Sequence, residues 1–518
     1  MSVSLALLLV LPVAAAVVTA WTRGPVRVTV ALLASGGTTA VVLSLARTTL
    51  ELGTPQRQRL PLPLGVEVAL VADGLAVVLL LMAAVVALAV VAFAAAELRQ
   101  DPDRHDWAYW PLLFTLWAAV NLLLVSGDLF TTYLMLELVA LCGSLLVTLR
   151  GDRGSILAGT RYFYAELVAS TTVLIGIALV WSEAGTVVFA ELAEALGDGP
   201  RASVGLAVIT AGLLLKAPLA PLHFWLPAAH TLAPSAVSPL LSGVMVKVAF
   251  AVLARLWFLS VPELVTPAAA QLVGAMGALA ILWGSFGALL ATGLKRLIAS
   301  STVAQIGLVF LLVPLVQAGS VDGWSGGVFA ALSHALAKGA MLMAAAVLVD
   351  SARQARQATI GVGSVAEVAD ARTRPTAADK PSVATRGETT WPLLTELRGS
   401  AARRPVAMMA FGIAALSLVG LPPSGGFVAK WYLLVGSIST GQWWWVVVLV
   451  VGTLLTVGYL MRFVRPAFAP PPDGERPVPR RDARDVVALA LASSTLLLGL
   501  VPGRLLALLT IGGPHGGG

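Results

Sequence analysis

Long apolar runs recur along almost the whole chain and constrain its fold more than any other feature. Windows of about twenty mainly apolar residues, the length that crosses a bilayer as a helix, occur fourteen times in the 518 residues. Charged residues make up only 12% of the chain, whereas a soluble domain carries about 25%. The composition therefore excludes a soluble enzyme, a nucleic-acid binder and a disordered scaffold, and predicts an all-α, polytopic membrane protein.

The same windows give the boundaries of each predicted membrane helix. The first window is interpreted as a retained helix and not a signal peptide, because no positive charge precedes it and further spans follow. The predicted spans are 3–20, 27–46, 70–96, 110–126, 128–148, 160–181, 203–222, 236–259, 268–291, 299–317, 325–349, 405–421 continuing brokenly to 440, 443–464 and 485–503.

Basic residues are distributed unevenly between the two sides of these spans. Loops and ends after odd-numbered helices hold 24 lysines and arginines, Lys295 and Lys380 among them, and those after even-numbered helices hold six. Basic loops stay in the cytoplasm, so both termini are expected outside a plasma membrane. Two polar stretches, 351–404 and 470–485, are interpreted as cytoplasmic linkers, the first partly disordered. Residues 189–196 (FAELAEAL) predict a short amphipathic helix at the outer interface.

Four of the six lysines lie inside apolar runs, at Lys216, Lys247, Lys338 and Lys430. A cation at the centre of a membrane helix costs about 2.5–3.5 kcal/mol, so four of them indicate a function. Buried lysine, unlike arginine, can lose its proton. Snorkelling toward an interface explains one lysine near a helix end, such as Lys338 or Lys430, but hardly all four. The pattern predicts a role in moving protons or ions.

Acidic residues add to this pattern. Glu137 lies in the middle of LFTTYLMLELVALCGSLLV, too deep for a solvated carboxylate. A glutamate beside a buried lysine lowers the desolvation cost of both, and changing their separation changes the proton affinity of both. Asp128, at the start of the same span, is either a helix cap or a relay. Asp73, which opens the third span in VADGL, has the same two interpretations.

Three histidines lie close to the lysines in sequence. His334 precedes Lys338 by four residues, so the two share one helix face, and we expect His334 to relay protons. His223 is interpreted equally as a relay or as a hydrogen-bonded structural residue. For His230 the structural interpretation is preferred.

Two spans contain helix breakers at mid-depth, in KAPLAPLH (216–223) and LVGLPPSGGFVAK (418–430). Broken backbone at this depth is tolerated where it faces protein or a water-filled cavity. Paired interrupted helices in two halves of a transporter indicate inverted repeats with an ion path between them. Lys216 precedes the first break and Lys430 follows the second. This reversed order is what two inverted repeats would give.

Several of these segments resemble one protein family over about residues 65–465. The chain is similar to the antiporter-like subunits, which are the proton-conducting membrane subunits of respiratory complex I, membrane-bound hydrogenases and Mrp-type Na+/H+ antiporters. The segments that carry this resemblance are GDLFTTYLMLE (127–137), KAPLAPLHFWLPAAHTLAPSAVSPLLSGVMVKV (216–248), LKRLIASSTVAQIG (294–307) and LSLVGLPPSGGFVAKW (416–431).

The resemblance implies a role for each buried charge. Glu137 matches the fifth-helix glutamate of the family and Lys216 its seventh-helix lysine partner. Lys247 matches the eighth-helix relay. His334 and Lys338 match the central axis, and Lys430 matches the broken-helix lysine.

The resemblance also implies fourteen core helices with two inverted five-helix repeats. On this basis residues 1–109 hold helices 1–3, and 110–260 form the first repeat with helices 4–8. Residues 261–468 form the second repeat with helices 9–13 and contain the linker 351–404. Residues 469–518 hold a linker and the last membrane helix.

The expected function is ion translocation within a hetero-oligomer of membrane subunits, with protons as the transported ion and Na+ as a second candidate. One complex I subunit that resembles this chain usually has glutamate at the position of Lys430, which leaves an Mrp D-type subunit or the lysine-bearing complex I paralogue. Of these two, the Mrp D-type subunit of a cation/proton antiporter is the preferred interpretation. The alternative is a proton-pumping subunit of complex I or of a membrane-bound hydrogenase. A non-conducting structural subunit is a third possibility, against which Glu137 and the four lysines argue. With a single cysteine, Cys142, and no dinucleotide fingerprint, no cofactor or metal site is expected.

Overall fold

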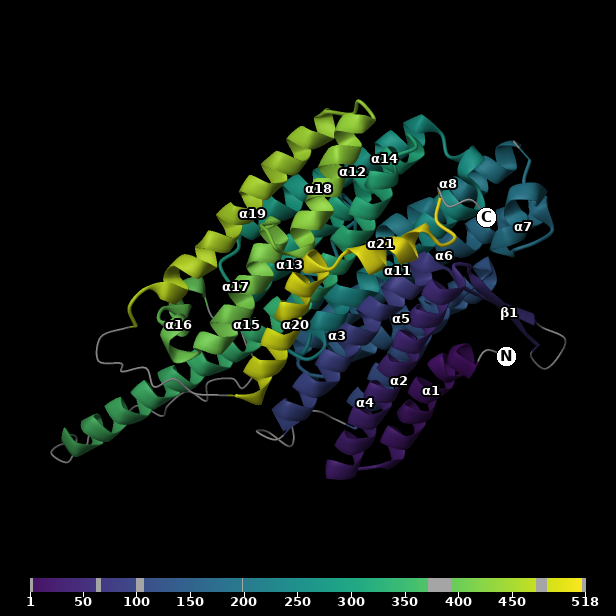
Figure 1. The fold of residues 1–518 in the computed structure, drawn as a ribbon. Coiled ribbons are helices and arrows are strands. Elements are labelled where there is room, and N and C mark those ends of the chain that lie inside the picture. The colour runs from purple at the N-terminus through teal and green to yellow at the C-terminus, as the bar shows by residue number, and fades with distance from the viewer. Residues whose placement is uncertain are drawn as a thin grey trace.

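The computed structural model describes residues 3–61, 67–98, 107–197, 199–370, 393–471 and 482–514 as a bundle of long helices (Figure 1). Its α-helices are α1 (Val3–Trp21), α2 (Gly24–Leu52), α3 (Gly74–Leu98), α4 (Tyr109–Val125), α5 (Leu129–Thr148), α6 (Arg153–Ala184), α7 (Phe189–Ala195), α8 (Pro200–Lys216), α9 (Leu226–Leu232), α10 (Ser238–Leu240), α11 (Val246–Ala254), α12 (Pro267–Leu290), α13 (Leu294–Phe310), α14 (Leu312–Gln317), α15 (Val321–Asp370), α16 (Ser400–Arg403), α17 (Pro405–Val419), α18 (Gly425–Ser439), α19 (Trp444–Phe468), α20 (Ala483–Leu500) and α21 (Gly503–Thr510). Two π-helical segments, η2 (Leu241–Met245) and η3 (Arg255–Ser260), flank α11, and short 3-10 turns form η4 (Pro262–Leu264) and η6 (Leu394–Leu397).

The helices confirm the predicted polytopic membrane architecture. Among the described residues, eleven helical segments are long and apolar enough to cross a membrane. Each coincides with a predicted span, and the other three predicted spans correspond to α4, α8 and the α17–α18 pair. Apolar windows locate these helices well because insertion into lipid depends on the summed hydrophobicity of one continuous segment.

A two-stranded hairpin precedes α3, and the sequence analysis did not predict it. Strand β1 (Gln56–Pro61) pairs antiparallel with β2 (Glu67–Ala72), with Gln56 opposite Ala72. The predicted third span therefore begins too early, at residue 70, whereas α3 begins at Gly74. The apolar residues of β2 continue without a break into the helix, so hydrophobicity alone cannot separate the strand from the span.

Both predicted helix breaks are present. Helix α8 ends at Lys216, and irregular backbone follows until α9 begins at Leu226. Helix α17 ends at Val419, and α18 begins at Gly425. Prolines lie in both interruptions, where their missing N–H groups and fixed φ prevent a continuous helix.

The predicted irregular linker 351–404 is wrong in its first part. Helix α15 does not end at the membrane boundary but continues to Asp370, giving a helix of 50 residues, which is about 75 Å long. Figure 1 shows its last turns projecting beyond the bundle near α16. The short helix predicted at 189–196 is present as α7, with Phe189 and Leu192 buried. Residues 472–481 of the second predicted linker lie outside the described part.

Burial divides the spans into a central and a peripheral set. The most apolar 18-residue windows of Ser238–Ser260, Leu294–Gln317 and Val321–Ala355 are completely buried within the chain, whereas only 28% of the corresponding α1 and α2 windows is buried. The central spans carry Lys247, His334 and Lys338, so these titratable side chains are surrounded by protein rather than lipid.

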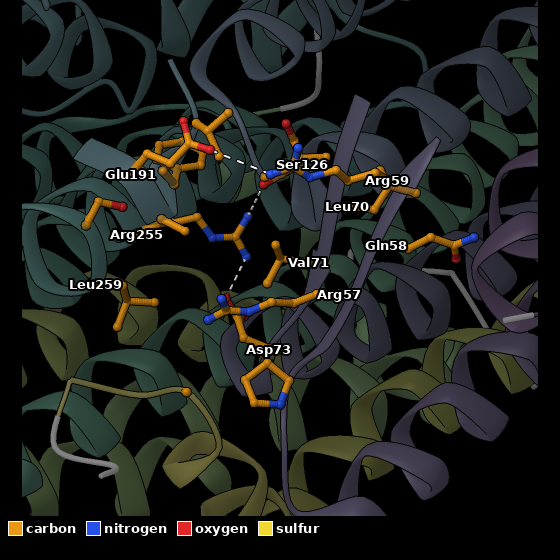
Figure 2. Close-up of a pocket in the computed structure, with 18 residues that line it drawn as sticks. Arg57, Gln58, Arg59, Leu70, Val71, Asp73, Ser126, Glu191, Arg255 and Leu259 are labelled. Atoms are coloured by element: carbon orange, nitrogen blue, oxygen red, sulfur yellow. Dashed lines mark hydrogen bonds and ion pairs between the residues drawn. The ribbon is translucent and has the colours of Figure 1, made fainter. Parts of the chain in front are cut away.

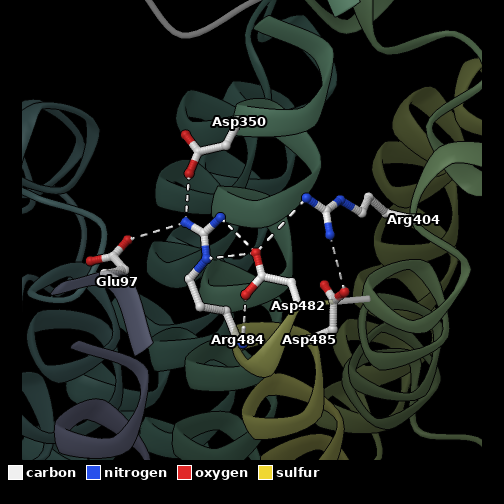
Figure 3. A network of polar contacts seen from close by, with 6 residues as sticks. All are labelled: Glu97, Asp350, Arg404, Asp482, Arg484 and Asp485. Atoms are coloured by element: carbon white, nitrogen blue, oxygen red, sulfur yellow. Dashed lines mark hydrogen bonds and ion pairs between the residues drawn. The ribbon is translucent and has the colours of Figure 1, made fainter. Parts of the chain in front are cut away.

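Buried charges also link helix ends on the side of the bundle away from the hairpin (Figure 3). Arg484 donates to Asp482 at 2.8 Å and to Asp350 at 2.7 Å, and lies 3.7 Å from Glu97. Arg404 pairs with Asp482 and with Asp485 of α20, the latter at 3.5 Å. The network joins α3, α15 and α20 to the start of α17.

Lys295 corrects another expectation from the sequence. Its position near a helix end predicted a cytoplasmic loop, but it is only 1% exposed and donates a hydrogen bond to the Ala233 carbonyl oxygen. Helix α13 begins one residue earlier, at Leu294, so this lysine belongs to the buried first turn of a central helix.

Candidate functional site

A buried ion pair lies where the first broken helix is interrupted. Lys216 is the last residue of α8, and its Nζ lies 2.8 Å from Oε2 of Glu166 on α6. Both side chains are more than nine-tenths buried. A small cavity of about 20 Å³ beside them is lined by residues that include Tyr162 and His230. This volume is enough for about one water molecule.

The expected direct pair between Lys216 and Glu137 is wrong, because Glu166 occupies that place. Glu137 lies on α5, is partly exposed, and has a buried Oε1 without a hydrogen-bond partner among the described residues. It is close enough to Glu166 for the two carboxylates to interact electrostatically. The structure therefore places Glu137 next to the pair, as a second carboxylate that faces partly outward.

Glu166 is the site residue that sequence reasoning missed. It lies in RYFYAELVAS, close to the predicted start of its span, and could be taken for an interfacial charge. Helix α6 begins at Arg153, so Glu166 is thirteen residues, or about 20 Å, from that end. If the predicted span had started near residue 153 and not at 160, the sequence would have placed this carboxylate deep in the membrane.

Two of the predicted central residues contact each other directly. Lys247 Nζ lies 2.6 Å from Nδ1 of His334 on α15, and it also donates to the Ser242 carbonyl oxygen at 2.6 Å. Ser242 belongs to η2, where π-helical backbone leaves carbonyl groups available to a side chain. The Nε2 atom of His334 is buried and has no hydrogen-bond partner in the described part of the chain. This pair connects α11 with α15.

Lys338 lies one turn after His334 and is fully buried. Its Nζ donates to the Ile298 carbonyl oxygen at 3.0 Å and to the Ser301 hydroxyl, both on α13. All of these acceptors are neutral. A cation held in this way keeps much of its desolvation cost, which favours a group that gains and loses a proton.

Lys430 lies next to the second break. Its Nζ donates to the Val419 carbonyl oxygen, the last residue of α17, at 2.7 Å and to the Thr453 hydroxyl on α19 at 2.8 Å. The buried Tyr459 of α19 lies beside Ser301, which binds Lys338. Helix α19 thus carries polar groups near both lysines.

His230 lies nearer the central lysines than sequence reasoning implied. It is 1% exposed, and both ring nitrogens lack a hydrogen-bond partner among the described residues. The imidazole is within electrostatic range of Lys247, Lys338 and Lys295. The preferred interpretation from the sequence is a hydrogen-bonded structural histidine, but the described residues supply no hydrogen-bond partner for its ring.

The other suggested relays lie elsewhere. His223 is partly exposed, and its ring contacts Trp283 of α12 edge-on at 5.9 Å. Asp128 is the N-cap of α5, accepting a hydrogen bond from the Thr131 backbone N–H at 2.6 Å, which supports the capping interpretation. Asp73 accepts from the Ala76 backbone N–H at the start of α3 and also binds Arg255 at 3.0 Å.

These contacts define a class of protein. It is a multi-pass membrane protein whose interior holds titratable groups near two broken helices. Comparison with known proteins identifies the family. The family model described as "NADH:quinone oxidoreductase/Mrp antiporter, TM" matches residues 126–366 and 382–456, which is more than half of the chain. The chain belongs to this family.

Relatives and solved structures agree with that assignment. The chain is 33% identical over 471 residues to NADH-quinone oxidoreductase subunit N of Desulforudis audaxviator, covering 89% of this chain and 84% of that protein. It is 30% identical over 421 residues to subunit N 2 of Solidesulfovibrio magneticus, covering 80% of each.

Among structures, a chain of the Mrp complex from Dietzia sp. matches with a TM-score of 0.81 and 24% identity, covering 100% and 99% of the two chains. A chain of respiratory complex I from Thermus thermophilus matches with a TM-score of 0.72 and 25% identity, covering 98% of this chain and 100% of that one. The Mrp match shows the fold alone.

Proposed function

We propose that this chain is a proton-translocating membrane subunit of a NADH:quinone oxidoreductase. The observation that carries the proposal is the buried sequence of titratable groups from the Lys216–Glu166 pair through Lys247 and His334 to Lys338. Their desolvation cost is justified where the groups exchange protons. The relatives named subunit N, similar over most of their length, favour this function over the expected Mrp D-type antiporter subunit.

In the proposed mechanism, protons move by changes of charge state along this row. Glu166 stabilises the charged form of Lys216, and a charge that moves toward Lys247 or Lys338 repels Lys216 and weakens the pair. His334 passes a proton between its two neighbouring lysines through its ring nitrogens. Lys430 and Glu137 then act at the two ends of the row, and other subunits of the complex supply the redox chemistry.

The chain is expected to lie in the plasma membrane with its basic loops in the cytoplasm. The hairpin, α7 and α21 then lie on the outer side. The residue ranges of the two inverted repeats, 110–260 and 261–468, remain part of this proposal. The broken helices α8–α9 and α17–α18 lie at corresponding places in them.

The test is proton pumping by the assembled complex in sealed vesicles, driven by NADH oxidation. Lys338→Met is expected to abolish most pumping while the amount of intact complex stays close to normal, because Met fills the same space without charge. Unchanged pumping per NADH oxidised would contradict the proposal. Na+-dependent proton exchange in the absence of NADH would instead support the antiporter function.

A further inference from the structure

A cavity of about 340 Å³ opens at the hairpin end of the bundle (Figure 2). The hairpin contributes Arg57 and Arg59, α7 contributes Glu191, and Leu259 and Ser260 come from η3. The cavity is large enough for many water molecules. We refer to it as the hairpin cavity.

Arg255 lies at the inner side of the hairpin cavity. Its guanidinium binds Asp73 at 3.0 Å and donates to the carbonyl oxygens of Ser126 at 2.7 Å and Leu124 at 3.1 Å. Its side chain is 10% exposed, and Nε has no hydrogen-bond partner among the described residues. Figure 2 shows the side chain extending between the chain segments that carry Asp73 and Ser126. A planar guanidinium held by three oxygen atoms is rigid.

A second, much smaller cavity also borders Arg255. It holds about 10 Å³ and shares Arg255 and Phe189 with the hairpin cavity. The rest of its wall is mainly apolar and includes Leu75, Leu79 and Val252. A narrow apolar space of this kind excludes water and ions until it widens.

The cavities follow one side of the helix that carries Lys247. Val248 lines the small cavity beside Lys216 and Glu166, Val252 lines the narrow apolar cavity, and Leu259 lines the hairpin cavity. Val248, Val252 and Arg255 are spaced by four and three residues along α11 and its end, so they share one helix face, and Arg255 lines both the narrow apolar cavity and the hairpin cavity. Val248 and Arg255 are separated by about 10 Å along the axis. The cavity beside the ion pair, the narrow apolar cavity and the hairpin cavity therefore follow one another along this face, with Arg255 between the last two.

We propose that this alignment is an ion route between the Lys216–Glu166 pair and the hairpin side, and that Arg255, held by Asp73, is its gate. A fixed positive charge at a narrow apolar point repels protons and metal cations. Releasing the guanidinium from Asp73 removes the barrier and lets water enter. The proposal rests on the proposed function, because it assigns an exit to the same proton path.

Cysteine accessibility tests the gate without relying on transport. The assembled complex carries Cys142→Ala, and single cysteines replace Val252 behind the gate, Leu259 in front of it, and Ala249 on another, buried side of α11. The probe is a membrane-impermeant trimethylammonium methanethiosulfonate. It is applied from the side of sealed vesicles on which Leu259→Cys reacts.

With Arg255 in place, Val252→Cys should react at least tenfold more slowly than Leu259→Cys. Adding Arg255→Ala should raise the rate at Val252→Cys at least tenfold and leave Ala249→Cys unreactive. Arg255→Lys should restore slow labelling, because a cation remains at the narrow point. Equal labelling of Val252→Cys with and without Arg255, in complexes where Leu259→Cys reacts normally, overturns the gate.

Asp73→Asn provides a second test if Arg255→Ala reduces assembly. Asparagine still caps α3 but binds the guanidinium more weakly, so labelling at Val252→Cys should rise by an intermediate factor. No increase in an assembled Asp73→Asn complex overturns the proposal. If the labelling shows that the gate opens but the complex does not pump protons, the result contradicts the proposed function and still supports the gate.

Discussion

The buried lysines have different partners, and the difference sets what each can do. Lys216 has a carboxylate partner in Glu166, so both charges can persist at that depth. Lys247 has an imidazole and a carbonyl oxygen. Among the described residues, Lys338 and Lys430 have only neutral oxygen acceptors. A proton relay requires two components. One is a stable ion pair, and the other is a set of lysines that are costly to keep charged.

Glu166→Gln should leave the charged form of Lys216 without its counterion. Breaking a buried pair by removing one partner costs about 3–5 kcal/mol, and removing both costs less. We expect at least a tenfold loss of pumping and less intact complex. The double variant Glu166→Gln/Lys216→Met should assemble better than Glu166→Gln but still fail to pump. Glu183→Gln, an exposed change on the same helix, is the matched control. Normal pumping by Glu166→Gln would remove the pair from the path.

Lys247→Arg should keep a cation next to His334 but prevent proton release, because a guanidinium stays protonated. Pumping per NADH oxidised is expected to fall at least tenfold, measured in vesicles with equal amounts of intact complex. Lys247→Met should fail similarly because it carries no proton. If Arg supports pumping and Met does not, Lys247 contributes a fixed charge and not a transferable proton.

At the scale of single elements, the second broken helix depends on close backbone contact. A Cβ atom at Gly426 would lie 1.8 Å from the Ser417 carbonyl oxygen, so the start of α18 and the end of α17 touch through backbone. Ser417 also shares a hydrogen bond of 2.9 Å with Ser333 of α15. Only glycine permits this approach, which keeps Lys430 next to the end of α17.

Gly426→Ala is therefore expected to separate α17 from α18. It should lower the free energy of unfolding by at least about 1–3 kcal/mol, the cost typical of overpacking. The measurement is the melting temperature of the purified complex, which should fall by several degrees. Gly412→Ala on α17 is the control, because its Cβ would meet nothing within 4 Å. A similar melting temperature for both variants would show that the contact is not needed.

At the scale of the whole molecule, charge networks hold together helices that are distant in sequence. Arg484 joins α20 to Asp350 on α15 and lies near Glu97 at the end of α3 (Figure 3). Helix α20 also contacts α17 and α18. The last membrane helix thus braces the second broken helix from one side.

Arg484→Gln should loosen this bracing, because several buried carboxylates lose a partner at once. We expect markedly less intact complex and a lower melting temperature. Arg484→Lys should restore little, because an ammonium group cannot reproduce the forked contacts of a guanidinium. Arg462→Gln, on the exposed side of α19, should behave like the unchanged protein. Full assembly of Arg484→Gln would show that packing alone holds α20.

The orientation predicts opposite accessibility at the two sides of the membrane. Lys380→Cys, outside the described residues, should react with an impermeant thiol reagent only from the cytoplasmic side. Thr54→Cys, exposed just before the hairpin, should react only from outside. Both measurements use intact cells and inverted vesicles of a Cys142→Ala strain. Labelling of Lys380→Cys in intact cells would reverse the topology.

The sequence by itself determined the membrane spans, the two breaks and the depth of the four lysines. These features depend on local quantities: the transfer free energy of a continuous apolar segment, the geometry of proline and the position of a charge within its own run. The β-hairpin escaped detection because its apolar strand runs into the next helix. The end of α15 was also missed, since polar composition alone does not distinguish an exposed helix from a linker.

Only the tertiary structure decided which charges meet. Glu166 and not Glu137 binds Lys216, although the two glutamates lie on neighbouring helices, because the side chain that faces α8 depends on how α5 and α6 are rotated. Arg255 and Asp73 are 182 residues apart and meet where α11 ends and α3 begins. Hydrophobicity sets how deep a residue lies in the membrane, but helix packing sets its neighbours, and the proton affinity of a buried group depends on those neighbours.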